Sequence, residues 1–184
     1  MRRLYIIMSI LTVALTVLPS DARDEQRKTR KEIRKEQRME EVHSLLTSGR
    51  YEIVVSKAFP MSGRMINLTS KYSLQVRQDT LVSNLPYFGR AYSIPYGGGD
   101  GLNFEVVNSE EEQNLIYRSD IRTSSVDKDS SRTDSRISIR AVTDEDVFDF
   151  NITVYAEGGV NISVTSNQRQ PISYSGEVRA LPQK

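Results

Sequence analysis

The chain has 184 residues, contains no cysteine, and carries 25 lysine and arginine residues against 24 aspartate and glutamate residues. The lack of cysteine excludes disulfides and a thiol nucleophile, and the balanced charge gives no electrostatic reason to expect a nucleic-acid partner. A chain of this length can bury one ordinary hydrophobic core without covalent cross-links.

The first 22 residues have the pattern of a secretory signal peptide. Arg2 and Arg3 precede an apolar run from Leu4 to Leu18, and Ser20 and Ala22 supply the small residues that a signal peptidase reads. The alternative is a membrane anchor, but a spanning helix needs about 20 apolar residues, and this run is shorter and contains threonines. We expect cleavage after Ala22 and an exported mature protein, periplasmic or extracellular, that does not span a membrane.

Residues 23–48 are predicted to form a charged helix. Its apolar residues come late, and Gly49 suits the position just past the end of a helix. We expect the last turns to pack against the following domain and the first turns to be solvated. The alternatives are a spacer from the membrane and a coiled-coil partner site, although the apolar heptad that a coiled coil requires is missing.

Residues 49–184 are predicted to form a single β domain, because apolar and polar residues alternate with period two. From Phe148 to Val154, for example, Phe148, Phe150, Ile152 and Val154 alternate with polar residues. Strands are expected near residues 51–58, 65–69, 72–77, 102–108, 114–119, 136–141, 148–154, 160–165 and 172–180. The expected fold is mainly β: an antiparallel meander barrel or sandwich of about nine strands with one N-terminal helix, of which a lipocalin-like barrel is one form.

The stretch from Tyr87 to Phe104 holds five of the 14 aromatic residues and five of the ten glycines of the chain. Aromatic side chains supply rigid contact area, and glycines allow sharp turns. One interpretation is a structural corner that closes one end of the β domain. The other is a pocket in which aromatic rings stack on a flat ligand and an arginine binds an anionic group. The candidate ligand-binding residues are Tyr87, Phe88, Arg90, Tyr92, Tyr96 and Arg169.

Four segments in this order resemble a known family: Asn67–Leu74, Leu85–Tyr92, Gly101–Phe104 and Ser166–Gly176. The string Leu-Pro-Tyr-Phe-Gly-Arg within the second segment is the most specific part. The chain resembles the domain-of-unknown-function family numbered 4251, small exported proteins of anaerobic gut bacteria, over roughly residues 45–181. The resemblance implies an exported β-rich protein, supplies no catalytic residues, and favours the corner interpretation of Leu85–Tyr92.

No motif in the sequence indicates catalysis, a metal or a cofactor. His43 is the only histidine and lies in the predicted helix, so a typical zinc site lacks its ligands. The acidic clusters Glu110–Glu112 and Asp144–Asp146 do not have the alternating ligand spacing of a calcium loop. The glycines of Gly97–Gly101 are not followed by the lysine of a phosphate-binding loop. A pair of catalytic carboxylates for glycoside hydrolysis is the one possibility that the sequence does not exclude. Such a pair is defined by the distance between two side chains in the folded protein, which sequence spacing does not give.

We therefore expect an exported, non-enzymatic domain without a cofactor. Its function would be to bind a small apolar or carbohydrate-like ligand or an envelope partner protein. A structural or scaffolding envelope protein without a small-molecule ligand is the main alternative, and a hydrolase is the third.

Overall fold

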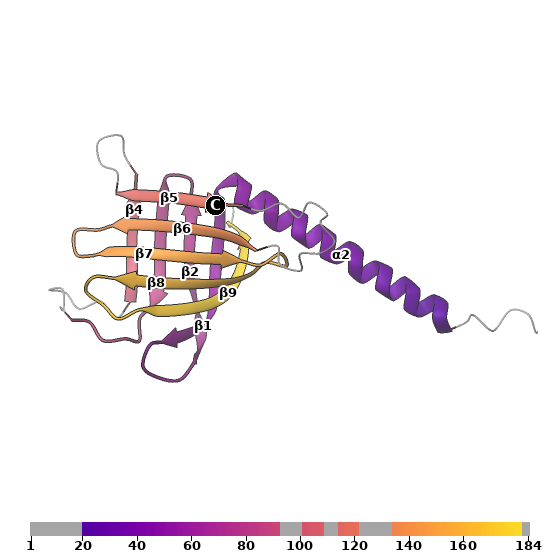
Figure 1. The fold of residues 1–184 in the computed structure, drawn as a ribbon, viewed down its shortest axis with the longest axis horizontal. Helices are drawn as coiled ribbons and strands as arrows, with labels where there is room; N and C mark the ends of the chain where they lie inside the picture. Colours follow the sequence, from indigo (N-terminus) through magenta and orange to yellow (C-terminus); the bar gives the residue numbers. More distant parts are fainter. Residues whose placement is uncertain (1–19, 93–100, 109–113, 122–133, 182–184) are drawn as a thin grey trace, which may run out of the picture. The chain divides into compact units, whose positions relative to one another are not determined.

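The computed structural model describes residues 20–92, 101–108, 114–121 and 134–181, with side chains from Arg27 onward. These residues form one helix and a nine-stranded antiparallel sheet (Figure 1). The elements are α2 (Ser20–Ser48), β1 (Arg50–Pro60), β2 (Ile66–Arg77), β3 (Thr80–Pro86), β4 (Gly101–Val107), β5 (Leu115–Asp120), β6 (Ser135–Val142), β7 (Val147–Val154), β8 (Gly159–Ser166) and β9 (Ile172–Ala180). The mainly β, antiparallel fold expected from the sequence is confirmed.

The strands follow one another as a meander that curls into a nearly closed barrel. Their order in the sheet is β4-β3-β2-β1-β9-β8-β7-β6-β5, so the pairing of β1 with β9 joins the first strand to the last. The half formed by β1–β4 lies across the half formed by β5–β9 (Figure 1). Among the described residues, β4 pairs with β3 alone and β5 with β6 alone. Within the described part of the chain, β4 and β5 are therefore the two edges of the sheet.

The β1–β9 seam requires a glycine. The register of both strands shifts at a bulge between Val55 and Lys57, and Gly176 of β9 lies so close to β1 that an added Cβ would collide with the carbonyl of Val54. A bulge increases the local bend of a strand, and glycine permits the close backbone approach. Together they let the sheet curl at its centre.

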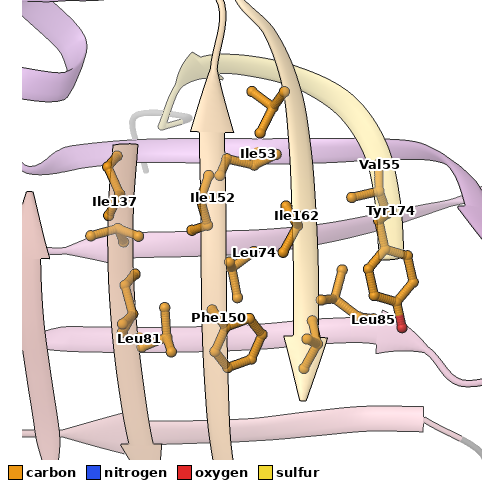
Figure 2. Close-up of a cluster of buried hydrophobic side chains, with 14 of the residues drawn as sticks. Ile53, Val55, Leu74, Leu81, Leu85, Ile137, Phe150, Ile152, Ile162 and Tyr174 are labelled. Carbon is orange, nitrogen blue, oxygen red and sulfur yellow. The ribbon is translucent and has the colours of Figure 1, made fainter. Parts of the chain in front are cut away.

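The core lies between the two halves of the sheet and is filled by side chains. On β6, buried and exposed residues alternate without interruption, as the sequence predicts, and on β7 and β8 every second side chain is buried. Figure 2 shows side chains from the two halves meeting, with Leu74 and Leu81 of one half beside Phe150 and Ile152 of the other. The largest fully buried side chains are Tyr51, Tyr174 and Phe150.

Two strand predictions were wrong in detail. The strands expected at 65–69 and 72–77 are one continuous strand, β2, because exposed Ser70 and Lys71 interrupt the apolar alternation without breaking the strand. The strand β3 was not expected. Its core-facing position Ser83 is polar, and this residue is buried because its hydroxyl donates to the carbonyl of Leu102 at 2.6 Å. A satisfied hydroxyl can occupy a core position that the hydrophobic pattern does not reveal.

Helix α2 is divided between two compact units, residues 1–37 and residues 38–184. In the first unit, every described side chain from Arg27 to Gln37 is exposed. In the second, Val42 and Leu46 belong to the hydrophobic core. Gly49 has a φ of 63° and its N–H donates to the carbonyl of Leu46 at 3.2 Å, which is the helix-ending role that its position predicts.

The helix begins at Ser20, three residues before the expected start. The expected signal peptide, residues 1–22, lies almost entirely outside the described residues. Within the described part of the chain, no helix is long and apolar enough to cross a membrane.

Candidate functional site

After β3 the chain turns through residues 87–92, which we call the corner. The corner lies against residues 168–170 of the β8–β9 connection. Main-chain contacts hold the two segments together. These contacts are an isolated bridge between Ala91 and Arg169, a hydrogen bond of 2.7 Å from the N–H of Tyr92 to the carbonyl of Gln168, and one of 3.0 Å from the N–H of Gln170 to the carbonyl of Arg90.

Tyr87 fastens the corner from within. Its hydroxyl is 2.9 Å from the carbonyl oxygen of Arg90 and 3.0 Å from that of Gln170, and it donates its one proton between them. The phenol ring lies over Gly89, where an added Cβ would collide with the hydroxyl. Burial raises the pKa of the Tyr87 hydroxyl above its usual value.

Arg169 joins the corner to β4. Its guanidinium carbon lies 5.4 Å from the centre of the Tyr87 ring, within the range of a cation–π contact. One guanidinium nitrogen donates to the carbonyl of Gly101 at 3.2 Å. Arg169 thus contacts the corner through its cation–π contact and β4 through this hydrogen bond.

A second tyrosine anchors the start of the corner. The hydroxyl of Tyr174, on β9, donates to the carbonyl of Pro86 at 2.7 Å. Neighbouring Leu85 is fully buried in the core. The segment with the most specific sequence is thus fixed by buried contacts at its first residues.

The structure brings together only part of the predicted ligand-binding set. Tyr87 and Arg169 are in contact, as described above. Arg90 is exposed and bonds to the neighbouring segment through its main chain. Phe88 is exposed, and Tyr92 is 72% exposed. Tyr96 lies outside the described residues. Ligand binding by these side chains stays a prediction.

A hollow of about 540 Å³ lies beside the corner, along the free edge of β4. Its lining comes from two elements that are far apart in sequence: the whole of β4 on one side and the β6–β7 turn, Val142–Glu145, on the other. Arg169 closes the end next to the corner, and Asn114 and Phe148 complete the lining. We call this the β4 hollow.

Aromatic rings form one face of the β4 hollow. Phe104 of β4 stacks on Phe148 of β7, with ring centres 4.8 Å apart and planes 16° apart. Phe150 lies behind them, 6.1 Å from Phe104. Phe148 and Phe150 are buried, whereas Phe104 is half-buried and lines the hollow. Phe104 closes the glycine- and aromatic-rich stretch of the sequence but was not among the predicted site residues.

Carboxylates stand at the rim of the β4 hollow. Exposed Asp144 and Glu145 come from the β6–β7 turn, and exposed Glu105 comes from β4. The next residue, Asp146, is buried and shapes the turn: one carboxylate oxygen accepts the N–H of Val147 at 2.8 Å and that of Asn167 at 3.2 Å. From the sequence, the cluster Asp144–Asp146 was considered only as a calcium site, which its spacing did not favour.

His43 and the acidic cluster Glu110–Glu112 are the other residues that the sequence raised as possible metal ligands. His43 is half-buried on α2, beside buried Val42. In the part of the chain that the structure describes, no three histidine, aspartate or glutamate side chains come together as a metal site would require. The acidic cluster Glu110–Glu112 lies outside that part.

Comparison with protein families decides which family this fold belongs to. The model of a family described as a domain of unknown function, DUF4251, matches residues 33–178. The chain belongs to the DUF4251 family. The match includes the corner, β4 and the β6–β7 turn, and it confirms the family resemblance seen in the sequence.

A solved structure agrees with this assignment. The crystal structure of a DUF4251 family protein from Bacteroides eggerthii is similar to this chain with a TM-score of 0.50. It shares 14% sequence identity, and the similarity covers 78% of this chain and 87% of that protein. At this identity the similarity shows the DUF4251 fold alone. Comparison with curated proteins found no match.

Proposed function

We propose that this DUF4251 protein is an exported, non-enzymatic binding domain that holds a small carbohydrate-like ligand in the β4 hollow. Export rests on the signal-peptide pattern of residues 1–22. The observation that carries the proposal is that one hollow of about 540 Å³ combines an aromatic face with polar groups from two elements. Ligand sites commonly consist of an apolar surface with a few placed polar groups.

The lining favours a sugar ring over a purely apolar ligand. A sugar presents a C–H face, which can lie against Phe104, and hydroxyl groups, which can donate to the carboxylates of Asp144 and Glu145. Asn103 supplies a further polar side chain. The free edge of β4 also offers main-chain groups that no described strand uses.

The charge of the rim argues against an anionic ligand. Glu105, Asp144 and Glu145 contribute three carboxylates, while Arg169 contributes one guanidinium that already donates to Gly101. An anion in the hollow would face these carboxylates, and like charges at close range repel. The role of an arginine in binding an anionic group, considered from the sequence, is therefore not part of this proposal.

A binding panel with charge-neutral variants tests the proposal. We expect at least one neutral mono- or oligosaccharide to raise the melting temperature of the wild-type protein. The double variant Asp144→Asn/Glu145→Gln should weaken that binding at least about tenfold, because charge-assisted hydrogen bonds are lost. Asp79→Asn/Glu177→Gln is the matched control, since it removes two carboxylates that do not line the hollow. Equal binding by both double variants would refute the site.

The same hollow supports a hydrolase as the second candidate. Glu105 and the pair Asp144/Glu145 come from different elements, and glycoside hydrolases place two carboxylates on either side of the bond that they cleave. Incubation of each bound saccharide with the protein separates the two functions. A binding domain returns the saccharide intact, whereas release of new reducing ends would establish the hydrolase. No binding to any saccharide or lipid would favour the scaffolding alternative.

A further inference from the structure

The β1–β2 hairpin extends past its neighbours in the sheet. β3 pairs with β2 only from Ser73 onward, so among the described residues the part of β2 from Ile66 to Tyr72 has no partner on that side. Figure 1 shows the hairpin running beyond the ends of β3 and β4. We call residues 59–65 the hairpin tip. The tip is available for contact with something outside the domain.

The hairpin tip exposes large apolar side chains. Phe59 is 40% exposed, Met61 72% and Met65 47%. Buried Ala58 faces the core, and because strand residues alternate between faces, its neighbours Lys57 and Phe59 belong to the outer face. Scattered exposed apolar residues are ordinary, but three within seven residues at a projecting turn mark an interaction surface.

Around the tip, beyond Glu52 near the start of β1, the charged side chains of the hairpin are all basic. From Ile53 to Gln78 the chain contains Lys57, Arg64, Lys71 and Arg77 but no aspartate or glutamate, although the whole chain is almost neutral. Arg64 stands in the tip itself and is exposed. The tip therefore combines apolar insertion groups with cations and carries no carboxylate that would oppose an anionic surface.

We propose that the hairpin tip docks this protein on an anionic lipid surface. Met61, Met65 and Phe59 insert at the boundary between headgroups and acyl chains, while Arg64 and Lys57 contact anionic headgroups. Peripheral anchoring of this kind combines buried apolar area with attraction to anionic lipids, and each cation near such a surface adds about 1 kcal/mol, or roughly fivefold in affinity. Methionine suits this role because its side chain is flexible and adapts to irregular surroundings.

Vesicle co-sedimentation of the protein purified from its native host tests the proposal. We expect binding to vesicles of phosphatidylglycerol and phosphatidylcholine, weak binding to phosphatidylcholine alone, and weaker binding as salt is raised. Met61→Ser/Met65→Ser should lower the partition coefficient at least about tenfold, and Arg64→Glu about fivefold or more. All variants carry the same N-terminus, so any contribution of that segment cancels.

Matched controls separate the tip from general surface effects. Ile116→Ser/Tyr155→Ser removes two apolar side chains that are similarly exposed, at 43% and 46%, and lie outside the hairpin. The substitution Arg118→Glu, on β5, makes the same charge change as Arg64→Glu in the tip. Both controls should bind within about twofold of wild type, and all variants should melt as wild type does. Binding that is unaffected by the tip substitutions, equal binding to neutral vesicles, or a dimer that the tip substitutions dissociate would overturn the proposal.

Discussion

At the scale of single residues, Tyr87 and Arg169 are the side chains that fix the corner. The hydroxyl of Tyr87 donates between the carbonyls of Arg90, within the corner, and Gln170, on the facing segment. The guanidinium of Arg169 donates to the carbonyl of Gly101 and contacts the ring of Tyr87. A hydrogen bond of this kind stabilises the folded state by roughly 1 kcal/mol. The corner should therefore be sensitive to the loss of one hydroxyl group.

Tyr87→Phe should lower the free energy of unfolding by about 1 kcal/mol, because the carbonyls of Arg90 and Gln170 lose their shared donor. Tyr92→Phe is the matched control, since Tyr92 is 72% exposed. Urea denaturation of the two variants and the wild type provides the measurement. An equal effect of both substitutions would show that the Tyr87 hydroxyl does not hold the corner.

The sequence indicated the residues of the corner but not those that line the β4 hollow. Tyr87, Gly89 and Arg169 could be singled out because aromatic, glycine and arginine residues are unusual in their local context. Phe104 and Asp144 could not be linked, because they are 40 positions apart and meet only through the curl of the sheet. No local pattern records how far a sheet curls.

At the scale of elements, the predicted strands were most accurate where one face is wholly apolar. β6 and β7 alternate strictly and were predicted closely. β3 was missed because buried Ser83 replaces an apolar residue at a core position. The helix shows the same principle at 3.6-residue spacing. Val42 and Leu46 in its last turns pack into the core, whereas Ile33 in its earlier turns is exposed.

Leu46→Ala on α2 should lower the free energy of unfolding by about 2–5 kcal/mol, because Leu46 is 2% exposed and its removal leaves a cavity. Ile33→Ala on the same helix removes a side chain that is 47% exposed. That variant should unfold within about 0.5 kcal/mol of wild type. Thermal and urea unfolding compare the two. A large effect at Ile33 would mean that the first turns of the helix also pack against other residues.

At the scale of the whole molecule, the two halves of the sheet enclose a core that contains buried tyrosines. Tyr51 and Tyr174 are almost completely buried, and burial raises the pKa of both hydroxyls above the usual value. The sequence predicts the class of this fold but not this placement. The hydroxyls of both tyrosines form hydrogen bonds at the edge of the core. The hydroxyl of Tyr51 bonds to that of Tyr117, and the hydroxyl of Tyr174 donates to the carbonyl of Pro86.

Because Tyr51 and Tyr174 are buried, we expect the free energy of unfolding to fall at alkaline pH. Below about pH 10 both the folded and the unfolded chain keep the phenolic protons, so neither tyrosine makes stability depend on pH. Above that pH the unfolded chain loses them while the folded chain retains them, and the free energy of unfolding falls by up to about 1.4 kcal/mol per pH unit for each tyrosine. Urea unfolding between about pH 9 and about pH 11 measures the slope. Tyr51→Phe/Tyr174→Phe should flatten it, and parallel slopes for variant and wild type would contradict this account.

The central claim is that the β4 hollow is a ligand site. Native mass spectrometry of the protein purified from its own host tests it most directly. We predict a bound small molecule on the wild-type protein that is absent or strongly reduced in Asp144→Asn/Glu145→Gln and retained in Asp79→Asn/Glu177→Gln. A wild-type protein that carries no small molecule and whose melting temperature no saccharide changes would contradict the claim.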